Sequence, residues 1–238
     1  DGSNGFVIEG LASYGSNPRL TFGDVNGDGI EDLVIDPSQD DAKAVTASKN
    51  IYVVYGSAGG WPAVLDVQDL DGANGFVVTP DAGLGLDLVY RGDETDLTGD
   101  GVSDLAVQQG ESYLNQNVST FILNSQTRGA AASYSTASIA GGSGLQIDNS
   151  AVNRASELLL SNHDSDGDGI NDLVLFVAPI GGTAGQLEYQ VIYGGPGLFG
   201  QIDPDTIVLD GDNGFKTIGP SASGGYTNFY EHLTDFNQ

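Results

Sequence analysis

DVNGDGIEDLVI, residues 24–35, is the most informative segment of this sequence. Side-chain oxygens stand at its first, third, fifth and ninth positions, glycine stands at the sixth, and an apolar run follows. A Ca²⁺ ion takes about six to eight oxygen ligands, and a turning backbone can deliver them from alternate positions and from the seventh carbonyl. Glycine at the sixth position permits the sharp turn. The stretch therefore predicts a nine-residue cation-binding loop that leads straight into a strand.

A helix–loop–helix calcium site is excluded by the residue at position 12 of this stretch. That class of site needs a bidentate Glu there, and this chain has Ile35. The closing carboxylate is instead Asp32, and the apolar residues after it favour a strand.

The loop recurs at residues 96–104 and 164–172, with starts 72 and then 68 residues apart, and a fourth, incomplete start follows 71 residues later. Repetition at a fixed period of this size indicates a repeat architecture. We expect about three complete Ca²⁺ sites and a truncated fourth, and Thr98 makes the second the weakest. The expected ligands, with the carbonyl at each seventh position, are Asp24, Asn26, Asp28, Ile30 and Asp32; Asp96, Thr98, Asp100, Val102 and Asp104; Asp164, Asp166, Asp168, Ile170 and Asp172; and Asp235 with Asn237.

Two further motifs keep the same period. DGSNGFVI, from Asp1, returns at Asp71 and Asp210, with a weaker copy at residues 143–145, and IYVVYGSAGG, from Ile51, has two looser echoes. Each unit then holds about four short strands and no convincing helix, and residues 157–161 align with the strand before the first loop. Four strands per repeat predict the blades of an all-β propeller. The repeats run approximately over 4–73, 74–142, 143–212 and, in part, 213–238.

These motifs resemble the FG-GAP repeat family, the integrin alpha-chain type of β-propeller, and in particular its bacterial extracellular members. Their blades carry a D-x-[DN]-x-D-G-x-x-D loop before a Leu-rich strand, as residues 24–35 do. The chain departs from the family at Thr98, and it lacks the "GAP" after the loop strand, where Asp36-Pro37 stands in the first repeat. The resemblance implies calcium binding, a secreted or cell-surface location, and a role in adhesion.

A closed propeller is expected to need more repeats than the 238 residues of this sequence contain. A blade with open edges is prone to pair with another chain, and the family's propellers have more blades than the three complete units found here. The sequence also has no signal peptide and no Met. We therefore expect a mature fragment or a piece of a larger propeller, completed by further repeats of the same polypeptide or by another chain.

The charge balance limits the possible partners. Seven basic residues against 33 acidic ones give a net charge of −26, which disfavours nucleic acid and anionic membranes. Eleven of the acidic residues lie in the three complete loops. The chain has no Cys, so calcium is the expected staple in place of disulfides. The longest apolar run, residues 173–180, is too short to span a membrane.

No catalytic motif was found among the patterns for zinc proteases, nucleophile elbows or phosphate loops. His163 and His232 precede acidic loops and are expected to pack there, Arg91-Gly92-Asp93 is expected to be a turn, and Trp61 is expected to be at least half exposed and the best single candidate for a ligand contact. The sequence favours a non-catalytic adhesion or binding module whose partner, a carbohydrate or a protein surface, stays open. The alternative is a propeller domain of, or accessory to, a secreted polysaccharide-active enzyme.

Overall fold

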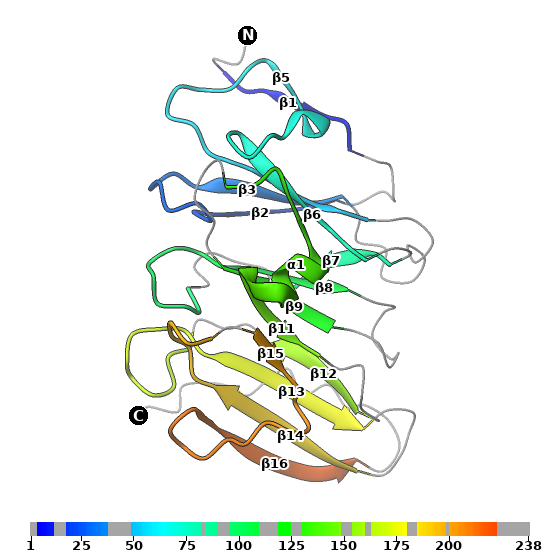
Figure 1. Cartoon of the computed structure of the whole chain (residues 1–238), viewed down its shortest axis with the longest axis vertical. Helices are drawn as coiled ribbons and strands as arrows, with labels where there is room; N and C mark the ends of the chain where they lie inside the picture. Colours follow the sequence, from blue (N-terminus) through cyan, green and yellow to red (C-terminus); the bar gives the residue numbers. More distant parts are fainter. Residues whose placement is uncertain are drawn as a thin grey trace.

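The chain folds into a series of β-sheets stacked along its long axis (Figure 1). The computed structural model describes residues 4–11, 18–37, 49–81, 84–89, 96–109, 119–124, 130–148, 154–159, 163–179, 185–198 and 200–222. A two-stranded pair lies at one end, two five-stranded sheets follow, and a four-stranded sheet lies at the other end. The predicted all-β class is confirmed.

The first five-stranded sheet is an antiparallel meander extended by one parallel strand. The acidic loop at residues 24–31 joins its outer strand to the next one. The meander consists of β2 (Arg19–Gly23), β3 (Asp32–Asp36), β4 (Ile51–Val54) and β6 (Gly75–Thr79), and β10 (Ser133–Ser135) pairs with β6 in parallel.

The next two sheets repeat the antiparallel meander, and the first of them also repeats the added parallel strand. In the second five-stranded sheet the meander is β7 (Leu86–Leu88), β8 (Leu105–Gln109), β9 (Ser119–Leu123) and β11 (Gly144–Ile147), and β15 (Gly200–Ile202) pairs with β11 in parallel. The four-stranded sheet consists of β12 (Arg154–Leu159), β13 (Leu173–Pro179), β14 (Gly185–Ile192) and β16 (Gly214–Ala222). The strand reading of the segment that aligned with RLTFG is confirmed by β12.

The parallel strands connect consecutive sheets. At the N-terminal end, β1 (Val7–Glu9) pairs in parallel with β5 (Val64–Asp66), which lies in the chain between β4 and β6 of the next sheet. In the same way β10 lies in the chain between β9 and β11, and β15 lies between β14 and β16, yet each extends the sheet before. We call β5, β10 and β15 the donated strands, because each adds to the sheet that precedes the sheet of its neighbours in the chain. The sequence did not predict them.

The hydrophobic cores lie between the sheets, so the central strands are buried on both faces. Ile51 and Val53 of β4 pack toward the second five-stranded sheet, whereas Tyr52 and Val54 pack toward the N-terminal pair. In β8 and β9 the same alternation divides the side chains between two cores. Continuous apolar runs such as IYVV are typical of strands buried in this way.

Helical structure is minor among the described residues. It consists of η2 (Val67–Asp69), α1 (Thr136–Ser138) and η3 (Ile139–Ser143), which lie between donated strands and the strands that follow them. No helix in the described ranges has the length and apolar character required to cross a membrane. The described sheets do not close into a ring, since β1 pairs with β5 and β16 pairs with β14 at opposite ends of the stack (Figure 1).

Candidate metal centre

The three acidic loops occupy equivalent places in three consecutive sheets. Residues 24–31 lie between β2 and β3, residues 96–104 precede β8, and residues 163–172 precede β13. In Figure 1 the loops project from the same side of the stack, at the left of the view. The strand after each loop is buried, so each loop is anchored at its closing end by the core.

The carboxylate at the first loop position is bound to the loop's own backbone. Asp24 accepts hydrogen bonds from the N–H groups of Gly27, Asp28 and Gly29 at 2.7, 3.1 and 2.8 Å. Asp96 and Asp164 accept the same three bonds in their loops, at 2.6 to 3.1 Å. These bonds wrap the loop round the carboxylate. Since a carboxylate offers about four lone-pair sites, it can accept them and still bind a cation.

The fifth and seventh positions are linked as well. Asp28, Asp100 and Asp168 each accept the N–H two residues on, from Ile30, Val102 and Ile170, at 2.8 to 2.9 Å. This Asx-type turn holds the peptide whose carbonyl was expected to be a ligand. The glycines between these positions, Gly29, Gly101 and Gly169, have φ of 81°, 82° and 90°, which only glycine adopts readily.

The ninth carboxylate is buried and ties the loop to the sheet. Asp32 is 0% exposed and accepts the N–H of Val25 at 3.0 Å and that of Gly56, just after β4, at 2.7 Å. Asp172 makes the same pair of bonds, from Ser165 and from Gly194 just after β14. Burial raises the pKa of Asp32 to about 6, although these hydrogen bonds lower it. Asp32 is therefore costly to keep ionised without a nearby cation.

In the first loop the third position also faces this carboxylate. The Nδ2 of Asn26 donates to both oxygens of Asp32 at 2.9 Å, and its Oδ1 is buried without a hydrogen-bond partner. A buried carbonyl oxygen without a donor is rare in native proteins. A cation bound to Oδ1 would satisfy it, so the donor set fits the expected ion.

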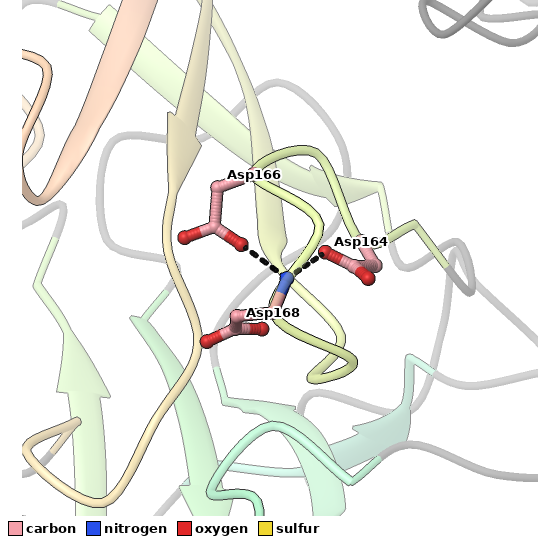
Figure 2. A group of neighbouring side chains, drawn as sticks. All are labelled: Asp164, Asp166 and Asp168. Carbon is pink, nitrogen blue, oxygen red and sulfur yellow. Dashed lines mark hydrogen bonds between the residues drawn. The ribbon is translucent and has the colours of Figure 1, made fainter.

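In the third loop three carboxylates converge (Figure 2). Asp164, Asp166 and Asp168 place ligand oxygens within 4.8 Å of one another. The backbone N–H of Asp168 donates to both of the other two carboxylates, at 3.1 Å. The pKa of Asp166 is raised by desolvation and by repulsion from the neighbouring carboxylates, whereas that of Asp164 is lowered, chiefly by the hydrogen bond from Gly169. A bound cation relieves the electrostatic repulsion between carboxylates that lie this close together.

The loops also contact one another in series. Ser103 of the second loop donates its N–H to the carbonyl of Asp24 at 2.9 Å, and Asn171 of the third donates to Asp96 at 3.3 Å. Val102 lies so close to Gly27 that a Cβ on the glycine would meet it at 3.0 Å, and Ile170 stands in the same way against Gly99. The candidate sites therefore form a connected row.

The sequence patterns assign no role in these sites to two kinds of glycine that the structure places there. The fourth-position glycines were given no role, yet Gly27, Gly99 and Gly167 have φ of 72°, 76° and 85° and permit the wrap round the first carboxylate. Gly56 and Gly194, which follow other strands, donate their backbone N–H groups to the ninth carboxylates Asp32 and Asp172. The sequence signal that could have identified Gly56 and Gly194 is the Tyr-Gly pair that each completes, Tyr55-Gly56 and Tyr193-Gly194.

The remaining candidate residues divide into two groups. Asp235, Asn237, His232 and residues 91–93 lie outside the described residues. His163 is partly buried and accepts the N–H of Asp172 with its carbonyl at 2.7 Å. The expectation that Trp61 is at least half exposed is wrong, since it is partly buried and stacks against Phe6 with ring centroids 5.5 Å apart.

The chain was compared with protein-family models, with curated proteins and with solved structures. No protein-family model, curated protein or solved structure matches the chain. The assignment of a function therefore depends on the loops and on the sheets that carry them.

Proposed function

We propose that this chain is a calcium-binding, non-catalytic adhesion or binding module that works outside the cell, built from propeller blades of the FG-GAP type. The observation that carries the proposal is the recurrence of one loop geometry in three consecutive sheets, with the first carboxylate wrapped by three backbone N–H groups each time. The stacked sheets are the blades in this proposal, completed as a propeller by further repeats or by another chain.

The donor set favours Ca²⁺ over softer metals. Each loop offers only oxygen: carboxylates, the Asn26 amide or the Thr98 hydroxyl, and a main-chain carbonyl. Carboxylates and carbonyls suit hard cations, and a flexible set of five or more oxygens suits Ca²⁺ better than the smaller Mg²⁺. The ions would be held by the first, third, fifth, seventh and ninth positions of each loop.

A structural role for the ions agrees with where the loops are attached. In the first and third loops the ninth carboxylate bridges the loop to a glycine after a central strand, Asp32 to Gly56 and Asp172 to Gly194. The second and third loops also each donate a hydrogen bond to the loop before. A cation in such a place would fix the mutual position of two strands and of two sheets. Binding to the folded state alone stabilises it by mass action.

An extracellular location agrees with the composition and with calcium levels. Extracellular modules bind Ca²⁺ with dissociation constants of about 0.1–1 mM, so free millimolar calcium fills them. The three ions would reduce the net charge from −26 to −20.

Calorimetric titration of the chain with Ca²⁺, followed by native mass measurement, tests the metal sites. We expect one ion for each complete loop and a loss of one ion in each of Asp28→Asn, Asp100→Asn and Asp168→Asn. Asp212→Asn, an exposed acid outside the loops, is the charge-matched control and should keep all ions. Binding that Mg²⁺ matches, or that the control reduces equally, would indicate diffuse surface charge instead of sites.

The non-catalytic part has its own test. The chain, loaded with calcium, is incubated with immobilised polysaccharides and with soluble ones. Retention without any release of new reducing ends is the expected result. Depolymerisation that persists in highly purified chain would favour the enzyme alternative.

A further inference from the structure

A buried lysine lies between the first and second five-stranded sheets and contacts two carboxylates. The Nζ of Lys49, two residues before β4, is 3.0 Å from Oδ1 of Asp36, the last residue of β3, and it also contacts the carboxylate of Asp87 in β7. Lys49 is 1% exposed and Asp36 is 0% exposed, whereas the side chain of Asp87 is 43% exposed. We call Lys49, Asp36 and Asp87 the buried amine cluster.

The backbone of β7 holds the lysine and the buried carboxylate in place. The N–H of Leu86 donates to the carbonyl of Lys49 at 3.0 Å, and the N–H of Leu88 donates to Oδ2 of Asp36 at 3.2 Å. Leu86 and Leu88 are themselves core residues, exposed by 0% and 2%. The amine and the carboxylate are therefore both anchored to one buried strand, with Asp87 between the two anchoring residues.

The repeated plan of the sheets does not require charged groups at this place. The residue four positions after the ninth loop carboxylate is Asp36 in the first loop strand, Gln108 in the second and Phe176 in the third. Lys49 is one of only seven basic residues in the chain. Burial of an ammonium and a carboxylate costs free energy that their mutual attraction does not readily repay. The cluster is therefore a particular feature of the first sheet, and the meander can form without it.

We propose that Lys49 and Asp36 condense to an amide bond that cross-links the end of β3 to the segment before β4. The Nζ of Lys49 attacks Cγ of Asp36, the bond from Cγ to Oδ1 breaks, and one water molecule leaves. Of the three protons of the ammonium group, one stays on the amide nitrogen and two leave with Oδ1. The step needs no oxidant, reductant or cofactor, and the bond closes the chain between residues 36 and 49 into a ring.

The cluster supplies the groups that such an acyl-transfer step needs. Asp87 contacts Nζ, so it can take a proton from the amine, return it to the departing oxygen and end unchanged. The N–H of Leu88 donates to Oδ2 of Asp36, the oxygen that becomes negative in the tetrahedral intermediate, and main-chain donors in that place stabilise the charge. Nucleophile, base and oxyanion donor thus meet at one carboxyl group.

Burial favours the condensed state over the ion pair. Groups held at hydrogen-bond distance react as if they were present at a very high concentration, and the burial of Lys49 and Asp36 excludes the water that hydrolysis of the amide needs. The amide also replaces two buried charges by a neutral group, so that of the three groups only the partly exposed Asp87 stays charged. Since the chain has no Cys, this bond is a covalent staple that is independent both of disulfides and of calcium.

Intact-mass measurement of the purified, denatured chain tests the bond. The expected mass is lower than the sequence mass by one water molecule. Lys49→Arg keeps the positive charge but replaces the amine, and Asp87→Asn removes the proton carrier, so both should have their full sequence masses. Asp36→Asn should form the same amide with loss of one ammonia molecule. A wild-type chain at its full sequence mass overturns the proposal, whatever the variants show, and an Asp87→Asn chain that condenses as fast as the wild type overturns the role of Asp87.

Trypsin digestion, which cleaves after Lys and Arg, locates the bond. An amide at Lys49 blocks cleavage there and joins the peptide of residues 20–43, which contains Asp36, to that of residues 44–91. Lys216, whose Nζ is 3.9 Å from Glu188 and whose side chain is 47% exposed, is the internal control and should be cleaved. Ring closure of an Asp or Asn side chain on its own backbone also changes the mass but links no peptides. Loss of water without a linked peptide, or a link from Lys49 to Asp87 within residues 44–91, overturns Asp36 as the acceptor.

Discussion

Replacing Asp32 by Ala separates the structural part of a loop carboxylate from its metal-dependent part. In chelator, the substitution leaves the buried N–H groups of Val25 and Gly56 without their acceptor, bonds of 3.0 and 2.7 Å in the wild type. Each unsatisfied buried donor costs about 1–3 kcal/mol. The same burial that raises the pKa of Asp32 to about 6 offsets part of this, because a buried charge is removed. We expect a net loss of about 2–4 kcal/mol of unfolding free energy without calcium.

Asp28→Ala is the matched comparison. Asp28 is exposed, and the bond that it accepts from the N–H of Ile30 is at the surface of the loop. In chelator this variant should lose less than about 1 kcal/mol. With calcium both variants should lose the stabilisation that the wild type gains from the first site.

The fluorescence of Trp61 is the appropriate probe, because this is the only Trp and it packs in the core between the N-terminal pair and the first five-stranded sheet. Denaturant unfolding is followed for the wild type and both variants, in calcium and in excess chelator. If Asp32→Ala proves as stable as the wild type in chelator, the bridge from the ninth carboxylate to Gly56 does not contribute to stability. If calcium still raises the unfolding free energy of Asp28→Ala as much as that of the wild type, the first loop is not a calcium site.

Three further predictions concern single positions. Thr98→Asp adds a carboxylate at the weakest third position, so it should raise the calcium affinity of the second loop about tenfold in a titration. Gly194→Ala would place a Cβ 2.2 Å from the carbonyl oxygen of Asn171, so thermal unfolding should show a loss of more than about 2 kcal/mol, whereas Gly141→Ala, with nothing within 4 Å, should cost little. In chelator the raised pKa of Asp32 means that the folded state holds its proton more tightly than the unfolded chain. Its contribution to stability is therefore complete below about pH 4 and is lost as the pH rises through about 6, and Asp32→Asn should lack this dependence.

The parts of the fold that sequence could predict are those set by local, repeated patterns. The apolar run after Asp32 became β3, and the NGF and aromatic motifs became β6 and β4, because each has an alternation or a turn of its own. The donated strands were missed because VLD, SYS and GQI are three residues long and share no pattern. Their partners also lie 55 or more residues away in the chain and belong to another sheet than their chain neighbours.

The candidate sites divide in the same way. Positions within a loop follow from spacing, so the wrap round Asp24 agrees with the predicted turn. The bond from Gly56 to Asp32 joins residues 24 apart through the sheet register, and no local pattern carries that information. The exposure of Trp61 was predicted from the glycine turn before it, whereas its partial burial depends on the distant Phe6, just before β1.

The donated strands set an order in which the molecule can be completed during synthesis. β6 emerges from the ribosome well before β10, its parallel partner 58 residues later along the chain at Ser133. The first five-stranded sheet must therefore wait, with the edge of β6 open, until β7, β8 and β9 of the second five-stranded sheet have been made. Each new sheet thus finishes the fold of the sheet before it, and the nascent chain always carries one unfinished edge at its growing end.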